Sequence, residues 1–75
     1  MCDVVQIDPE IMGGTPVFKG TRVPISTLFE YLADVVPNQD PIAEFLEQFP
    51  SVSPDQIARL LEHFRAIAAS AHRAA

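Results

Sequence analysis

The sequence predicts a small, mainly α-helical domain, with a three-helix core and an N-terminal arm of short strands and turns over residues 1–24. Two observations support this fold class. Hydrophobic residues recur at helical spacing in three segments, over residues 25–36, 41–49 and 54–68. Prolines and glycines separate these segments, as they do at the ends of helices and in turns. At 75 residues the chain has room for one domain, residues 1–75, with a thin core.

The N-terminal arm alternates extended runs with turns. Residues 4–7 form a β-branched run that ends at Asp8-Pro9, a turn-forming pair. Gly13-Gly14 and Gly20-Thr21 supply the backbone freedom that tight reversals need, and residues 16–19 between them are expected to be extended. The arm has too few hydrophobic residues to fold by itself. We therefore expect it to lie against the helices or to pair with a second copy of the chain.

The first predicted helix follows Pro24, and Pro37 is expected to stop it because proline lacks the backbone N–H and clashes with the preceding turn. Its apolar face follows the helical period. The residues on that face are Ile25, Leu28, Phe29, Leu32 and Val36.

Stronger start signals mark the two later helices. Asp40-Pro41 is an N-cap followed by proline at the first helical position, and Pro50 ends the helix that follows. Ser53-Pro54 starts the third helix, where Gln56 can close a capping box with Ser53. The apolar stripes are Ile42, Phe45, Leu46 and Phe49 in the second helix and Ile57, Leu60, Leu61, Phe64 and Ile67 in the third.

The short turn over residues 50–52 between the last two helices suits a helix-turn-helix unit, which places its second helix in the DNA major groove. Glutamine can pair with adenine and arginine with guanine. The exposed face of the third helix would carry Gln56, Arg59 and His63. The alternative is an ordinary helical hairpin with a polar outer face, in which Arg59 pairs with Asp55 or Glu62.

Negative charge is concentrated in the middle of the chain. The net charge is −5, and residues 26–52 contain five acidic side chains and no lysine or arginine. An acidic balance argues against nucleic acid as a partner. The helical carboxylates in this region are Glu30, Asp34, Glu44 and Glu47. They form either a solvated acidic face or a surface for a partner with a basic face.

Neither catalytic nor metal-binding residues are predicted, and no cofactor. Glu44 and Glu47 share a helix face, but no neighbour would separate their pKa values for acid–base work. The single cysteine, Cys2, excludes an internal disulfide, and His63 and His72 do not converge with it on a metal. An enzyme would need a cluster assembled across a dimer interface. With no secretion signal and no membrane-spanning run, we expect a cytoplasmic, oligomeric protein that is not an enzyme.

A longer pattern covers most of the chain. From Gly13 to Arg22 the sequence reads Gly-Gly-Thr-Pro-Val-Phe-Lys-Gly-Thr-Arg, followed later by Phe49-Pro50 and by a helix start from Ser53 to Ile57. In these features residues 4–67 resemble the domain-of-unknown-function family 433, whose hallmark is Gly-Gly-x-Pro-x-x-x-Gly-Thr-Arg before three helices. The joint over residues 35–41 departs from the family, whose members usually place a glycine and a short turn there.

The resemblance implies a homeodomain-like helix-turn-helix fold and the role of a VapB-like antitoxin. Such a protein neutralises a small toxin of the PIN-like ribonuclease kind and, as a homodimer, represses its own operon. In this interpretation Gln56, Arg59 and His63 face the operator DNA, while Lys19 and Arg22 approach its phosphates. The acidic surface of the middle helices would cover a basic face of the toxin.

Two alternatives remain open at this point. Lys19 and Arg22 can instead tie the arm to carboxylates of the helices. The whole chain can also be a protein-interaction adaptor without DNA binding, which its net charge of −5 favours.

Overall fold

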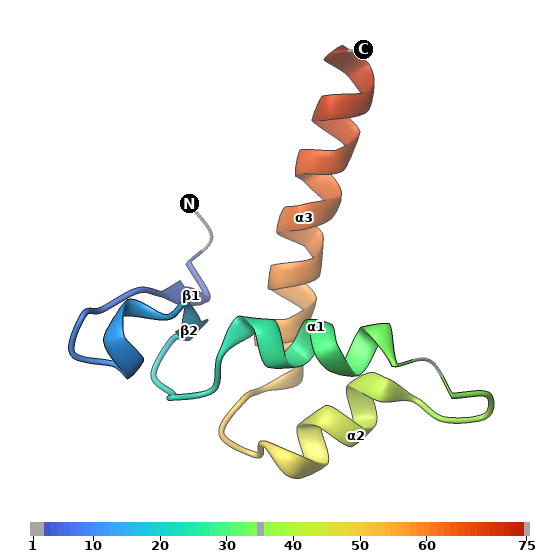
Figure 1. The fold of residues 1–75 in the computed structure, drawn as a ribbon. Coiled ribbons are helices and arrows are strands. Elements are labelled where there is room, and N and C mark those ends of the chain that lie inside the picture. The colour runs from blue at the N-terminus through green and yellow to red at the C-terminus, as the bar shows by residue number, and fades with distance from the viewer. Residues whose placement is uncertain (1–2, 35, 75) are drawn as a thin grey trace.

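The computed structural model describes residues 3–34 and 36–74 and is mainly helical, as predicted (Figure 1). Three helices follow a two-stranded hairpin. In chain order the elements are β1 (Val5–Gln6), the 3-10 turn η1 (Met12–Gly14), β2 (Val17–Phe18), α1 (Ile25–Ala33), α2 (Pro41–Gln48) and α3 (Pro54–Ala74). Within the ranges described, none of the helices combines the length and hydropathy that crossing a membrane requires.

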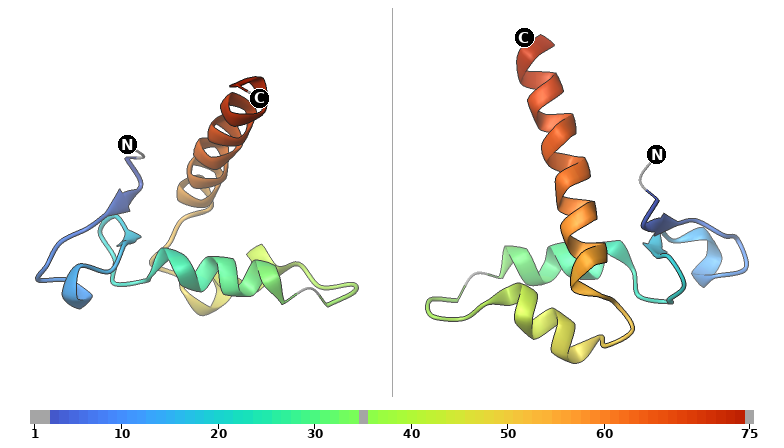
Figure 2. Two further views of the ribbon diagram at one scale, coloured as in Figure 1. Left: turned by 45° about the horizontal axis from the view of Figure 1, so that its top comes forward. Right: turned by 180° about the vertical axis from the view of Figure 1, so that it is seen from behind.

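The elements form an open, L-shaped molecule. α1 and α2 lie beside each other as a base, and α3 projects away from that base in every view (Figures 1 and 2). The β1–β2 hairpin stands at the end of the base where α1 begins. The principal extents are 37 × 37 × 19 Å, so the molecule is flat as well as angled. This shape leaves a concave side between the hairpin, α1 and α3.

The N-terminal arm packs on the helices, which is the first of the two alternatives that the sequence left open. β1 and β2 are antiparallel, with Val5 opposite Phe18 and Gln6 opposite Val17. The backbone N–H of Lys19 donates to the carbonyl of Val4 at 2.9 Å and closes the hairpin. Val17 and Phe18 have no exposed surface, so the arm supplies part of the hydrophobic core.

Phe45 of α2 stands at the centre of that core. Its ring centroid lies 5.9 Å from that of Phe18, 5.4 Å from Tyr31 and 4.9 Å from Phe49. These contacts join the hairpin, α1 and the end of α2 through one fully buried side chain. The core cluster consists of Val4, Phe18, Ile25, Leu28, Phe45, Val52, Ile57 and Leu60.

The predicted helix starts are confirmed. Asp40 Oδ1 accepts hydrogen bonds from the backbone N–H groups of Ile42 and Ala43, at 3.1 and 3.3 Å, and so caps α2. α2 ends at Gln48, one residue before the predicted end. Phe49 has left the helical region (φ −127°, ψ 72°), because the residue before a proline is disfavoured there.

The ends of α1 and α3 differ from the predicted bounds. α1 stops at Ala33 rather than at residue 36, since Asp34 already has ψ of 74° and the chain must turn back toward α2. Val36 is therefore outside the helix and 42% exposed. α3 continues to Ala74 rather than ending at residue 68, because its alanine-rich second half contains no helix breaker.

The apolar stripe of α3 is only half buried. Ile57 and Leu60 are 2% and 0% exposed, whereas Phe64 and Ile67, which the periodicity placed in the core, are 45% and 51% exposed. No other part of the described chain lies over the outer half of α3 (Figures 1 and 2). Helical periodicity identified the apolar face correctly but did not show what covers it.

Candidate functional site

The residues singled out by the sequence lie on two separate surfaces. One surrounds the start of α3, which the helix-turn-helix interpretation turns toward DNA. The other is an acidic hollow between α1 and α2. The first we call the α3-start cluster, consisting of Asp3, Lys19, Ser53, Asp55, Gln56 and Arg59.

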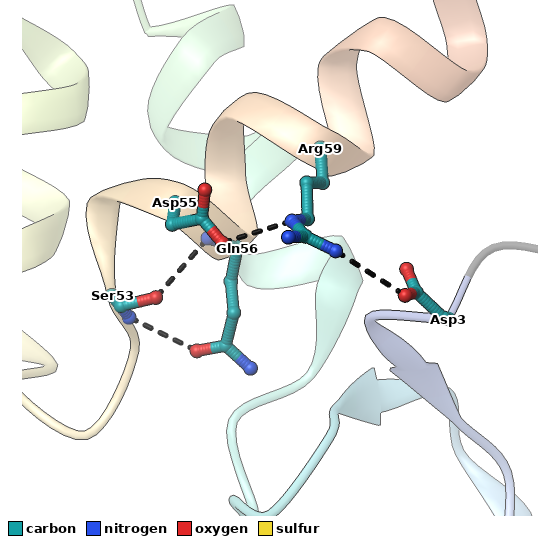
Figure 3. Close-up of polar contacts among 5 residues, drawn as sticks. All are labelled: Asp3, Ser53, Asp55, Gln56 and Arg59. Atoms are coloured by element: carbon teal, nitrogen blue, oxygen red, sulfur yellow. Dashed lines mark hydrogen bonds and ion pairs between the residues drawn. The ribbon is translucent and has the colours of Figure 1, made fainter.

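Gln56 of the α3-start cluster is a structural side chain. Its Oε1 accepts from the backbone N–H of Ser53 at 3.0 Å, and its own backbone N–H donates to Ser53 Oγ at 3.1 Å (Figure 3). This is the reciprocal capping box that the sequence predicted. The side-chain Nε2 also donates to the carbonyl oxygen of Lys19, at 3.1 Å. With both ends of its amide engaged, Gln56 has to break these contacts before it can pair with a base.

Arg59 lies between two carboxylates. Its Nε is 2.9 Å from Asp55 Oδ2, and its Nη1 is 3.4 Å from Asp3 Oδ2 at the start of the arm (Figure 3). The alternative that pairs Arg59 with Asp55 is thus confirmed, whereas Glu62 pairs with Arg65 instead. All of the side chains in these pairs are more than half exposed, so the pairs add little stability. They do cancel the positive charge that Arg59 would present to DNA.

The side chains of the remaining residues predicted to bind DNA take no part in these contacts. His63 is half-buried, with its ring edge-on to Phe64 at a centroid distance of 5.7 Å. Lys19 and Arg22 are exposed on the turn after β2. Within residues 3–34 and 36–74 neither of them makes an ion pair, so the alternative in which they tie the arm to helix carboxylates has no support among these contacts. The arm is instead linked to α3 by the hydrogen bond from Gln56 to the backbone carbonyl of Lys19, and no sequence pattern indicates this contact.

The pKa values shift at one exposed pair further along α3. The bidentate hydrogen bonds from Arg65 lower the pKa of Glu62 below its ordinary value, with the guanidinium charge acting in the same direction. The same contact raises the pKa of Arg65. Both groups therefore stay charged and paired at neutral pH, and this segment of α3 has no net charge to offer a ligand.

The acidic hollow brings together three of the four predicted partner-binding carboxylates. It has a volume of about 270 Å³. Its lining residues are Glu30, Tyr31, Asp34, Val36, Gln39 and Glu44. Glu47 is exposed on α2 but does not line the hollow.

Tyr31 and Val36 give the hollow an apolar wall that sequence reasoning missed. The Tyr31 ring packs edge-on against Phe45 and Phe49, which fixes its position at the base of the hollow. Glu30 lies on α1 and Asp34 directly follows the end of that helix, while Glu44 approaches from α2. Carboxylates around an apolar wall suit the side chain of a lysine or arginine, whose stem is apolar and whose head is cationic. In the part of the chain that is described, no three histidine, cysteine or acidic side chains are placed to hold a metal ion.

Comparison with known proteins identifies the family. The family model described as "Protein of unknown function (DUF433)" matches residues 5–63, which is most of the chain. The chain belongs to the DUF433 family. Its match runs from β1 to the middle of α3, so the outer half of that helix lies beyond the part that the DUF433 model describes.

A longer relative shares this region. The chain is 36% identical over 55 residues to "Uncharacterized protein y4eO" of Sinorhizobium fredii. The aligned residues make up 73% of this chain and 23% of the relative. The chain therefore spans less than a quarter of that protein's length. No solved structure matches the chain.

The DUF433 hallmark has a structural explanation in the hairpin. Gly13, Gly14 and Gly20 have φ values of 65°, 90° and 80°, a region that side chains with a Cβ rarely adopt. Thr21 Oγ1 donates to the carbonyl of Phe18 at 2.8 Å and accepts from the N–H of Val23 at 3.0 Å. The glycines and the threonine of the pattern thus build the turns that place Phe18 in the core.

Proposed function

We propose that this DUF433 protein is the antitoxin-like member of a toxin–antitoxin pair, and that it holds a small PIN-like ribonuclease toxin through its acidic hollow. The observation that supports the proposal is the grouping of Glu30, Asp34 and Glu44 around an apolar wall. No lysine or arginine between residues 26 and 52 competes for these carboxylates. A cytoplasmic location follows from the proposal, because the toxin and its RNA substrate are there.

The chemistry of the partner explains why an acidic hollow suits it. A ribonuclease binds RNA phosphates through lysine and arginine side chains. One of these side chains would lay its stem against Tyr31 and Val36 and bring its charged head to the carboxylates. Occupying that surface keeps RNA away from the toxin. Opposite charges on the two surfaces also speed their association.

Repression of an operon by DNA binding has less support from the geometry. Gln56 is engaged by the capping box and by the carbonyl of Lys19, and Arg59 is neutralised by Asp3 and Asp55. DNA binding therefore stays a prediction. Lys19 and Arg22 are the side chains best placed to meet phosphates, and sequence-independent affinity that falls with salt would be their signature.

The test is co-purification of the tagged chain after co-expression with the products of its neighbouring genes. We expect a small ribonuclease-like protein in near-equal amount. We also expect the combined variant Glu30→Gln, Asp34→Asn and Glu44→Gln to slow complex formation by about tenfold or more at low salt. Glu47→Gln is the matched control, since Glu47 is an exposed glutamate of α2 outside the hollow.

Each outcome discriminates between the interpretations. Recovery of a partner that is not a nuclease, still dependent on the hollow, would replace the antitoxin proposal by a protein-interaction adaptor. Recovery of the chain with no partner would overturn both. A loss of binding in Glu47→Gln equal to that in the combined variant would show that overall charge, rather than the hollow, determines the interaction.

A further inference from the structure

A second hollow, on the concave side of the molecule, is almost entirely apolar. It is a groove of about 350 Å³ between the hairpin, α1 and the first half of α3. Side chains that line it include Val5, Pro16, Ile25, Phe29, Leu60 and Phe64. It shares no lining residue with the acidic hollow. The two surfaces can therefore be occupied independently.

The outer half of α3 continues the same apolar surface into solvent. Ile57, Leu60, Phe64 and Ile67 follow the alternating spacing of three and four residues that pairs helices. The ring of Phe64 stands edge-on to Phe29, at a centroid distance of 5.6 Å and an angle of 83°, and so forms the upper edge of the groove. Ile67 lies one turn further along the same face and is 51% exposed.

We propose that the groove and the outer half of α3 together bind a second copy of this chain, with the two α3 helices antiparallel and the Ile67 side chain of each copy seated in the groove of the other. Leu60 and Phe64 of α3 form one wall of the groove, and the Ile67 side chain that would fill the groove of the other copy lies one turn further along the same helix. A two-fold axis that passes between Phe64 and Ile67 places the Ile67 side chain of each copy against the groove of the other. The same contact then forms twice, as a self-complementary interface requires.

Charge favours a second copy over another partner at this groove. None of the residues that line the groove is charged, and Glu62 and Arg65, which flank Phe64 in the sequence, pair with each other at 2.6 Å. This face is consequently neutral, although the chain has a net charge of −5, and two copies meet here without repulsion. A partner with a basic surface would be drawn to the acidic hollow instead.

The exposed apolar area agrees with a small dimer interface. Phe29, Phe64 and Ile67 are 39%, 45% and 51% exposed. At about 200 Å² for a large apolar side chain, each copy contributes roughly 270 Å² of apolar surface from these residues. Since apolar atoms make up about 60% of an interface, two copies would bury roughly 900 Å² in all. This is close to the lower limit of about 1,000 Å² for a specific interface, so we expect a dimer that dissociates on dilution.

Sedimentation equilibrium of the purified chain tests the proposal without any toxin. We expect a mass twice that of one chain at the concentrations used for NMR, and a dimer dissociation constant at least about tenfold higher in Ile67→Glu. Ala69→Glu is the matched control, because it places the same charge on the exposed opposite face of α3. Circular dichroism should show equal helix content in both variants, since neither position is buried. A wild-type chain that stays monomeric, or equal weakening by both variants, would overturn the proposal.

The antiparallel arrangement has its own test. In a mixture of isotope-labelled and unlabelled wild-type chains, the Ile67 methyl groups of one copy should show NMR contacts with the Phe29 ring of the other. A dimer without these contacts would overturn the arrangement.

Discussion

The side-chain Nε2 of Gln56 donates a hydrogen bond to the backbone carbonyl of Lys19, 3.1 Å away and 37 residues earlier in the chain. Because Oε1 of the same amide accepts from Ser53 N, one side chain both caps α3 and fastens it to the hairpin. The glutamine that the helix-turn-helix pattern assigned to base reading thus has an internal role. It links the start of α3 to the turn after β2.

Two substitutions at Gln56 distinguish the contributions of these two contacts to stability. We expect Gln56→Ala to lower the free energy of unfolding by about 1–2 kcal/mol, because both the capping box and the link to Lys19 are lost. Gln56→Glu should cost less, since a carboxylate can still accept from Ser53 N. Urea denaturation measures both, and Gln48→Ala, at an exposed helical glutamine, should change stability by less than about 0.5 kcal/mol. Equal costs for Ala and Glu would contradict a contribution from the capping box, and a Glu variant as stable as the wild type would contradict one from the Lys19 contact.

Substitutions at Gly20 test the backbone conformation of the turn after β2. Its φ is +80°, and a Cβ built on it would meet nothing within 4 Å, so the cost of a side chain here is conformational only. We expect Gly20→Ala to destabilise the fold by about 1–2 kcal/mol. Gly20→Asn should cost less, because asparagine tolerates positive φ. Thermal unfolding of the two variants under identical conditions provides the comparison, and a more stable Ala variant would argue against this turn geometry.

A substitution at Phe45 tests how much the centre of the core contributes to stability. It is fully buried against Phe18, Tyr31 and Phe49, so Phe45→Ala should cost about 3–5 kcal/mol. A domain of this length is stable by only about 4–11 kcal/mol, and the variant should be largely unfolded under mild denaturing conditions. Far-UV circular dichroism measures the loss. Val36→Ala is the control, since that side chain is 42% exposed and outside the core cluster.

Glu62 gives the chain a defined dependence on pH. The hydrogen bonds from Arg65 lower the pKa of Glu62, so its contribution to stability is present above the unfolded pKa and is lost as the pH falls through the folded value. Because the pair is exposed, the change in stability should be small. An NMR titration of the Glu62 carboxyl should show its pKa rising in Arg65→Gln. Arg59→Gln should leave it unchanged, since Arg59 pairs with Asp55 and Asp3.

Local signals in the sequence were sufficient to predict the helix starts. Asp40 and the Ser53–Gln56 pair act within four residues of themselves, so their hydrogen bonds follow from the order of residues. α2 likewise ends before Pro50, one residue from the predicted position. The end of α1 was missed because it depends on how the chain returns to α2, which is set by packing.

Long-range contacts explain the other differences. The burial of Phe18 depends on the hairpin folding back against Phe45, and no periodicity in the arm signals that contact. Glu30, Asp34 and Glu44 were predicted as an acidic surface, but the hollow needs Tyr31, whose place is fixed by rings of another helix. Arg59 was assigned two alternative roles, and the nearby Asp3 at the start of the arm could not be foreseen.

α3 is a single continuous helix with one half in the core and the other in solvent. The direction in which Phe64 and Ile67 point is therefore set by how Ile57 and Leu60 are seated, since all four share one helical register. A change in the core that rotates α3 would turn its outer face by the same angle. The interior and the outward-facing surface of this protein cannot vary independently, and substitutions in one should be accompanied by substitutions in the other as relatives diverge.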